Sequence, residues 1–124
     1  MEVQVISIID DDSSVRAAAD NLLTSYGFEV YTFASAKDFL QSACLHGSSC
    51  VVADVQMPGM SGLDLLAEIR SRGNHTPFIF ITAFPDRSVR IRALKIGAAC
   101  FLEKPFTSAA LIESIEIVLK QKKS

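Results

Sequence analysis

The sequence predicts a doubly wound α/β domain, in which helices cover both faces of a parallel sheet. Strand-like and helix-like patterns alternate five times along the 124 residues, which is typical of this class. The strand-like segments are short apolar runs, as expected for buried parallel strands. Four of these runs end at residues that can contact phosphate or a metal ion. Because ligands of open α/β sheets bind beyond the carboxyl ends of the strands, that edge is the predicted site.

The five predicted strands are the apolar runs of the sequence. The second run alternates between apolar and polar residues, which favours an edge strand, whereas the others are more continuously apolar. The runs are Val3–Ile9, Phe28–Phe33, Cys50–Ala53, Phe78–Ile81 and Cys100–Leu102.

Five helices are predicted from helical spacing and from capping residues. Acceptor side chains at the start, with Asp three residues later, indicate N-terminal caps, and glycine after the last apolar residue indicates an end. The first predicted helix begins near Ser13 and ends at Gly27, and the second runs from Ser35 (with Asp38) through Cys44. The third runs from Ser61 (with Asp64) through Arg72. The fourth spans Arg87–Ile96 before Gly97, and the fifth follows Thr107 to residue 121.

Composition describes an ordinary globular domain. The chain is 49% hydrophobic and 21% charged, with a net charge of −2, so we expect no direct binding of nucleic acid. No apolar run approaches the roughly 20 residues that span a bilayer, and the N-terminus lacks a signal-peptide pattern. We therefore expect no membrane association and a cytoplasmic location. A metal site at Cys44, His46 and Cys50 is disfavoured because a fourth ligand at zinc-like spacing is missing, and His75 lies in a polar loop.

The strand ends gather acids, a hydroxyl and an ammonium at one edge. Two unit charges 4 Å apart repel by about 4 kcal/mol at an effective dielectric of 20, so clustered acids need a proton or a divalent cation. All candidate ligands are hard oxygens, which favours Mg²⁺. The residues are Asp10, Asp11 and Asp12 after the first run, Asp54 after the third, Thr82 after the fourth and Lys104 after the fifth.

A magnesium ion beside a carboxylate suggests phosphoryl transfer to an aspartate. The added group carries about −1.5 to −2 charges, which Mg²⁺ and Lys104 would balance while the Thr82 hydroxyl donates a hydrogen bond. Each residue also has a purely structural alternative. The three acids can cap the first helix, Thr82 can satisfy a strand end, and Lys104 can pair with Asp54. Their coincidence at one edge favours the phosphoryl hypothesis.

Four motifs resemble the receiver domain of two-component response regulators, and the resemblance covers essentially the whole chain. The second motif and the stretch Phe101–Phe106 look most like the FixJ-type subfamily. The motifs are Ile8–Asp12, Asp54–Gly62, Ile81–Ala83 and Lys104–Phe106. The resemblance implies a flavodoxin-like strand order 2-1-3-4-5, which the receiver protein CheY also has. It also implies a receiver domain over residues 1–121, with residues 122–124 as the start of a linker or a frayed terminus.

The resemblance assigns roles to the edge residues. Asp54 is the implied phosphoryl acceptor, Asp10 and Asp11 organise Mg²⁺, and the Gln56 backbone carbonyl also contacts the metal. Thr82 and Lys104 contact the phosphoryl group, and Phe101 is the implied switch aromatic, for which a plain core position is the alternative. A cis Lys104–Pro105 bond is implied. Gln56 and Phe84 occupy positions thought to tune phosphoryl lifetime.

The family also implies partners and an output. A cognate histidine kinase would phosphorylate the chain, which would then dimerise through residues 87–121 and act on transcription through a C-terminal helix-turn-helix domain. The expected interface residues are Ile91, Lys95, Ala110, Ser114 and Ile117. In this interpretation the chain is a switch rather than an enzyme. The alternatives are an aspartate-nucleophile phosphatase, which would turn over a substrate, and a constitutive interaction module with no need of Mg²⁺.

Overall fold

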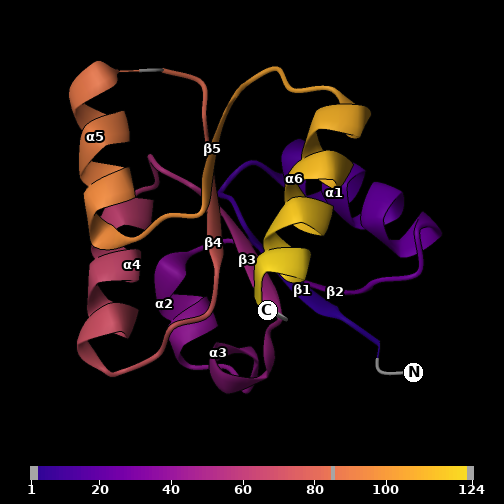
Figure 1. The fold of residues 1–124 in the computed structure, drawn as a ribbon, viewed down its shortest axis with the longest axis horizontal. Helices are drawn as coiled ribbons and strands as arrows, with labels where there is room; N and C mark the ends of the chain where they lie inside the picture. Colours follow the sequence, from indigo (N-terminus) through magenta and orange to yellow (C-terminus); the bar gives the residue numbers. More distant parts are fainter. Residues whose placement is uncertain (1–2, 85, 123–124) are drawn as a thin grey trace.

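A five-stranded parallel sheet in the order β2-β1-β3-β4-β5 forms the centre of the molecule (Figure 1). The computed structural model describes residues 3–84 and 86–122. The strand order confirms the expectation from the family resemblance. The strands are β1 (Val5–Ile9), β2 (Glu29–Phe33), β3 (Cys50–Asp54), β4 (Phe78–Thr82) and β5 (Cys100–Glu103).

The described residues form six helices, where five were expected. They are α1 (Ser13–Ser25), α2 (Ala36–Leu40), α3 (Cys44–Gly47), α4 (Gly62–Ser71), α5 (Arg87–Ile96) and α6 (Ser108–Lys122). The extra helix arises because the predicted second helix is interrupted. The Ser42 hydroxyl donates to the Phe39 carbonyl and accepts from the Cys44 amide, which replaces the helical pattern with a turn. At the other end of the chain α6 continues through Lys122, one residue beyond the predicted boundary, and residues 123–124 lie outside the described residues.

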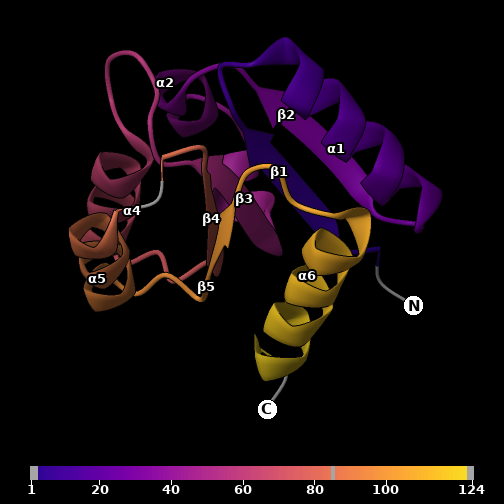
Figure 2. The same ribbon diagram turned by 90° about the horizontal axis from the view of Figure 1, so that it is seen from above.

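Two apolar clusters hold the helices against opposite faces of the sheet (Figure 2). On one face, α1 and α6 contribute Leu23 and Leu111 to a cluster with β-strand residues. On the other face, α2 to α5 contribute residues such as Phe39, Leu66 and Ala93. The central strands β3 and β4 are buried along their whole length, whereas β2 is largely exposed, as predicted for an edge strand. No helix within the described residues is long and apolar enough to span a bilayer.

Local capping fixes where three of the helices begin or end. Asp12 caps α1 by accepting a hydrogen bond from the Ser14 amide at 2.8 Å. Ser61 and Asp64 form a reciprocal capping box at the start of α4, as predicted. At Gly97, which ends α5, the backbone φ is +111°, a conformation that glycine adopts without a steric penalty. The cap at Asp12 accounts for the third acid of the Asp10–Asp12 run.

Candidate functional site

Three carboxylates converge at the carboxyl edge of the sheet. Asp10 and Asp54 lie side by side because β1 pairs with β3, with Ile9 opposite Ala53. Ligand oxygens of Asp10, Asp11 and Asp54 all lie within 4.8 Å of one another. Asp10 is completely buried, Asp54 is almost so, and Asp11 is exposed. The structure therefore brings together the acids that the sequence placed at this edge.

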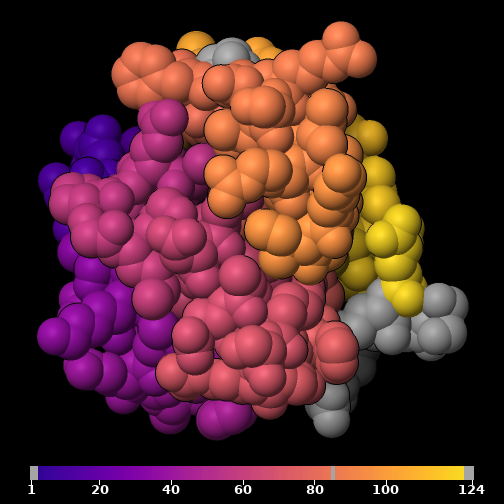
Figure 3. Space-filling model, turned by 90° about the vertical axis from the view of Figure 1, so that its left-hand side faces the viewer, coloured from indigo at the N-terminus to yellow at the C-terminus, as the bar shows by residue number. Residues whose placement is uncertain are grey.

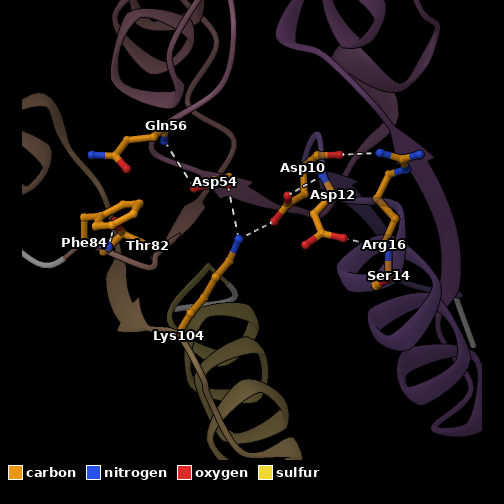
Figure 4. A network of polar contacts seen from close by, with 9 residues as sticks. All are labelled: Asp10, Asp12, Ser14, Arg16, Asp54, Gln56, Thr82, Phe84 and Lys104. Carbon is orange, nitrogen blue, oxygen red and sulfur yellow. Dashed lines mark hydrogen bonds and ion pairs between the residues drawn. The ribbon is translucent and has the colours of Figure 1, made fainter.

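Lys104 joins the two buried carboxylates. Its Nζ donates to Asp10 Oδ2 at 2.9 Å and to Asp54 Oδ2 at 3.2 Å (Figure 4). Burial alone would lower the pKa of the Lys104 ammonium, but hydrogen bonding and charge attraction from Asp10, and then from Asp54, outweigh it and raise the pKa overall. The ammonium is thus held in its charged form between the acids. The structural pairing of Lys104 with Asp54, one of the sequence-based alternatives, is present.

The second oxygens of the buried acids accept backbone hydrogen bonds. Asp10 Oδ1 accepts from the Asp12 amide at 2.9 Å, and Asp54 Oδ1 accepts from the Gln56 amide at 3.1 Å. Each loop therefore wraps around the carboxylate that precedes it. Because a carboxylate oxygen has two lone pairs, these bonds orient Asp54 without exhausting its capacity to accept. Exposed Asp11 is the most accessible oxygen ligand beside it.

Asp54 is harder to ionise than an ordinary aspartate. Burial is the main reason that its pKa is raised, and the neighbouring charge of Asp10 adds to the effect. The hydrogen bond from the Gln56 amide and the contact with Lys104 act in the opposite direction without cancelling it. A cation at the carboxylates would favour the ionised form.

Arg16 also belongs to the site, although the sequence analysis did not single it out. Its Nη1 donates to the Asp10 backbone carbonyl at 2.7 Å. Arg16 stands one helical turn after the capping acid, with its amide bonded to the Asp12 carbonyl, and this spacing from the acidic run was the available signal. The edge thus carries four carboxylates, those of Asp10, Asp11 and Asp54 and that of the capping residue Asp12. Against two cations, Lys104 and Arg16, they give a net charge of −4 + 2 = −2. That residual charge and the all-oxygen donor set fit one Mg²⁺ ion.

Thr82 and Lys104 are linked through the ends of β4 and β5. The Thr82 side chain is buried, and its Oγ1 accepts a hydrogen bond from the Phe84 amide at 3.1 Å. The Thr82 carbonyl accepts from the Lys104 amide at 2.7 Å. As the resemblance implied, the Lys104–Pro105 peptide is cis. In Figure 4 the exposed Gln56 and Phe84 side chains lie on the same side of Asp54.

Phe101 lies half-buried on β5, between the site and the outer surface. Its ring packs against the apolar cluster under α4 and α5, and it lines an open cavity of about 290 Å³. Arg87, Arg90 and Glu103 line the same cavity. Phe101 is therefore neither a wholly buried core residue nor a free surface residue.

The residues expected on the output surface are not all exposed. Ile91 on α5 is 44% exposed and Ile117 on α6 is 47% exposed. Ser114 is only 9% exposed and accepts a hydrogen bond from Cys100 Sγ at 3.5 Å, so it does not belong to the surface. Its position in the helix turns it toward β5, which the spacing of apolar residues alone did not reveal. Leu94, 49% exposed on α5, is a surface apolar residue that the sequence analysis missed.

Known proteins resemble this chain over nearly its whole length. Residues 6–116 match the response regulator receiver domain. Nodulation protein W of Bradyrhizobium diazoefficiens is 41% identical over 111 residues, covering 90% of this chain and 49% of that protein. The transcriptional regulatory protein FixJ of Azorhizobium caulinodans is 43% identical over 114 residues, covering 92% and 54%. The chain thus spans about half the length of these curated relatives.

Solved structures have the same fold. The response regulator StyR superimposes with a TM-score of 0.89 at 42% identity, over 97% of this chain and 61% of that one. The structure titled FixJ-N superimposes with a TM-score of 0.86 at 35% identity, over 97% and 96%. Sequence and fold agree over the same residues, and on this ground the chain belongs to the response regulator receiver domain family.

Proposed function

We propose that Asp54 accepts a phosphoryl group from a phosphohistidine of a partner kinase, and that the chain acts as a signalling switch. The observation that carries the proposal is the placement of Asp54. It is nearly buried, hydrogen-bonded by Lys104 and by the Gln56 amide, and within 4.8 Å of two further carboxylates. A carboxylate oriented in this way is prepared to act as a nucleophile.

The reaction transfers one group between two side chains. An Asp54 carboxylate oxygen attacks phosphorus, the bond from phosphorus to the histidine nitrogen breaks, and the electron pair stays on the imidazole. Lys104 Nζ, which already contacts Asp54 Oδ2, would turn one of its hydrogen bonds to a phosphoryl oxygen. The Thr82 hydroxyl, whose oxygen accepts from Phe84, keeps its proton to donate to another. Catalysis of this kind is mostly positioning and charge neutralisation.

Mg²⁺ is the proposed cofactor. Asp11 and Asp54 would be its carboxylate ligands, the Gln56 backbone carbonyl a third ligand, and Asp10 would complete the acidic pair while it stays bonded to Lys104. When bound, the ion would neutralise the negative charge of the phosphoryl oxygens. The net charge of −2 at the edge supports a single divalent cation.

Labelling with acetyl phosphate tests the acceptor. We expect the wild type to gain the mass of one phosphoryl group only when Mg²⁺ is present, and Asp54→Asn to gain none. Asp38→Asn is the matched control, because Asp38 is an exposed acid in the first turn of α2, away from the site. Labelling of the Asp54→Asn protein would assign the nucleophile elsewhere. Turnover of a phosphate ester would favour a phosphatase, and an output independent of Mg²⁺ would favour a constitutive module.

An apolar groove beside the site is where we place the partner kinase. The groove encloses about 520 Å³ between α1 and the start of α6 and reaches Lys104. Ala18 and Phe106 line it, whereas exposed Ala17 does not. Ala18→Arg should slow phosphotransfer from the cognate kinase by about tenfold or more without changing labelling by acetyl phosphate. Ala17→Arg is the control. Equal slowing by both variants, or by neither, would contradict this placement.

The proposed switch couples Thr82 to Phe101. Movement of the Thr82 hydroxyl toward the phosphoryl group would vacate space for the half-buried Phe101 ring, which is a two-position element of the kind that switches use. Nuclear magnetic resonance spectra with the beryllofluoride phosphoryl mimic should show shifts at both residues. An unchanged spectrum over residues 82–106 would exclude the mechanism.

Charge complementarity supports a homodimer through residues 87–121 after phosphorylation. Helix α5 exposes Ile91 and Leu94 among basic residues, including Lys95, and Figure 3 shows this helix on the surface beside α4. Across the edge strand β5, α6 carries Ile117 among acidic residues, and Ala110 lies half-buried near its start. The exposed charges within the described residues are Arg87, Arg90, Arg92 and Lys95 on α5, and Glu113, Glu116 and Lys120 on α6.

A single charge tests this dimer surface. Ile91→Asp should abolish association of the beryllofluoride-activated protein in sedimentation experiments, because it places a carboxylate on the apolar part of the surface. Val3→Asp is the control, since Val3 is 61% exposed on another part of the molecule. Activated dimers of the Ile91→Asp protein would exclude the interface.

The remaining proposals concern the whole protein. Because the chain spans about half of its curated relatives, we propose that residues 1–121 form the receiver domain and that a helix-turn-helix domain follows them. Control of transcription would then pass through that domain, without direct contact between the receiver and nucleic acid. Phosphorylation by an intracellular kinase domain would place the protein in the cytoplasm.

A further inference from the structure

Both histidines of the chain line one cavity at the amino-terminal edge of the sheet, far along the strands from the acids. The cavity has a volume of about 400 Å³ and lies between α3 and the loop that precedes β4. The chain contains only two histidines, and they are 29 positions apart in sequence. The lining residues are His46, Arg72, Gly73, Asn74, His75 and Thr76.

A hydrogen-bonded clamp joins α3 to the loop that precedes β4. Asn74 Nδ2 donates to the Leu45 carbonyl at 2.8 Å, and His46 and His75 are the residues that directly follow these two partners. Asn74 Oδ1 in turn accepts from the Thr76 amide at 2.9 Å and from the Thr76 hydroxyl at 2.6 Å. The clamp therefore fixes the backbones that carry the two imidazoles next to each other, so the cavity is preformed.

Arg70 adds two hydrogen bonds to the loop that precedes β4. Its Nη1 donates to the carbonyls of Asn74 and Thr76, each at 3.0 Å. The β4-side loop is thus tied both to α3 and to α4, and a ligand that binds between the imidazoles would not have to order it. Preorganisation of this kind lowers the entropic cost of binding.

The chemistry of the lining favours an anion. Arg72 lines the cavity and uses Nε, not an Nη group, for its bond to Glu68 at 2.8 Å. No acidic side chain is among the described residues that line the cavity. The Thr76 hydroxyl donates to Asn74 Oδ1, so these two side-chain oxygens are engaged with each other. The groups left for a ligand are a guanidinium fork and two imidazoles, which suit a phosphate oxyanion.

We propose that this cavity binds a phosphate group, with Arg72 and the two imidazoles as its donors. Its volume exceeds that of a single phosphate, so the ligand can be inorganic phosphate or the phosphate end of a small monoester. The site is separate from the phosphoacceptor edge, because it lies where β3 and β4 begin, whereas Asp54 lies where β3 ends. The proposal therefore does not depend on phosphorylation of Asp54.

Titration of the two imidazole resonances tests the site directly, since the chain offers no other histidine signals. The protein would be kept in chelator and titrated with inorganic phosphate and separately with ribose 5-phosphate. We expect saturable shifts of both histidines. Tighter binding of the ester would identify a monoester as the ligand, whereas equal binding would identify phosphate itself.

Variants separate a built site from general attraction to positive charge. Arg72→Gln should weaken binding by about tenfold or more, and the same loss in the control Arg92→Gln, an exposed arginine of α5, would overturn the proposal. His75→Gln should also weaken binding, because it removes one of the two imidazoles that line the cavity. Shifts that do not saturate, or saturation by Zn²⁺ but not by phosphate, would also overturn it.

Discussion

Asp54, the proposed nucleophile, is subject to two opposing requirements in the resting chain. A nucleophilic carboxylate must be ionised, but burial and the nearby charge of Asp10 raise the pKa of Asp54. The Lys104 ammonium and the Gln56 amide offset only part of this effect. The ionised form of Asp54 is therefore destabilised in the folded chain, and a bound cation would stabilise it.

Replacing this residue should stabilise the metal-free chain. Because the pKa of Asp54 is raised, the folded state holds its proton more tightly than the unfolded state, and stability falls as the pH rises from the ordinary carboxyl range through the raised pKa. Asp54→Asn should unfold at higher temperature near pH 7 in chelator, by on the order of 1 kcal/mol or a few degrees. The gain in stability should vanish in acid, where Asp54 is protonated in both the folded and the unfolded state. It should be absent in Asp38→Asn. A gain that does not change with pH would contradict this cause.

Gly62 lets α4 begin directly against the end of β3. A Cβ at this position would clash with the Asp54 carbonyl oxygen and would lie 2.9 Å from the Phe80 ring, whose neighbours are also buried. Gly62→Ala should therefore lower the free energy of unfolding by about 1–3 kcal/mol. It should also slow phosphorylation, since the displaced backbone carries Asp54.

Urea unfolding and acetyl phosphate labelling measure the two effects of this substitution. Gly47→Ala is the matched control, because a Cβ there would meet nothing within 4 Å and the backbone φ is not in the left-handed region. If Gly62→Ala were as stable and as active as Gly47→Ala, the close packing of α4 on β3 would have no energetic role.

At the scale of elements, the start of α4 is fixed by its capping box. The Ser61 hydroxyl accepts from the Asp64 amide at 3.1 Å, and the Asp64 carboxylate accepts from the Ser61 amide at 3.4 Å. Ser61→Ala should cost about 1 kcal/mol of unfolding free energy. Ser108→Ala should be nearly neutral, because the cap of α6 comes from the Thr107 hydroxyl. Chemical denaturation of both variants checks the difference, and equal losses would argue against the box.

Elements were predictable where a local signal and the burial pattern agree. The five strands and the caps at Ser35 and Ser61 follow from apolar runs and from short-range hydrogen bonds that any chain with these residues can form. The break between α2 and α3 was not predictable. Ser42 is compatible with a continuous helix. The turn at Ser42 is favoured over that helix because it lets both Phe39 and Leu45 pack into the apolar cluster.

At the scale of the molecule, the site exists because distant segments meet. Lys104 is 94 residues from Asp10 and 50 from Asp54, and it contacts both. The strand order places β1 between β2 and β3, so the acids at the ends of β1 and β3 are neighbours. Lys104 follows β5, and its side chain reaches past β4 to contact them. Folding and assembly of the site are therefore the same event.

Mg²⁺ should accordingly stabilise the whole fold. A ligand that binds only the folded state adds about 2.7 kcal/mol at a concentration one hundred times its dissociation constant. The melting temperature of the wild type should rise with MgCl₂ and reach no plateau at modest excess. Asp11→Asn should lose most of this rise, because exposed Asp11 is the freest of the three clustered carboxylates. An undiminished rise in Asp11→Asn would remove Asp11 from the ligand set.

The sequence by itself determined the fold class, the edge of the sheet that carries the chemistry and the identity of its main side chains. These depend on local periodicity and on the rule that parallel strands end together. Only the tertiary structure decided the hydrogen bond of Arg16, the burial of Ser114 and the placement of His46 and His75 along one cavity. Each of these depends on where a side chain points after distant segments pack, and packing directions are set by the whole core rather than by neighbours in sequence.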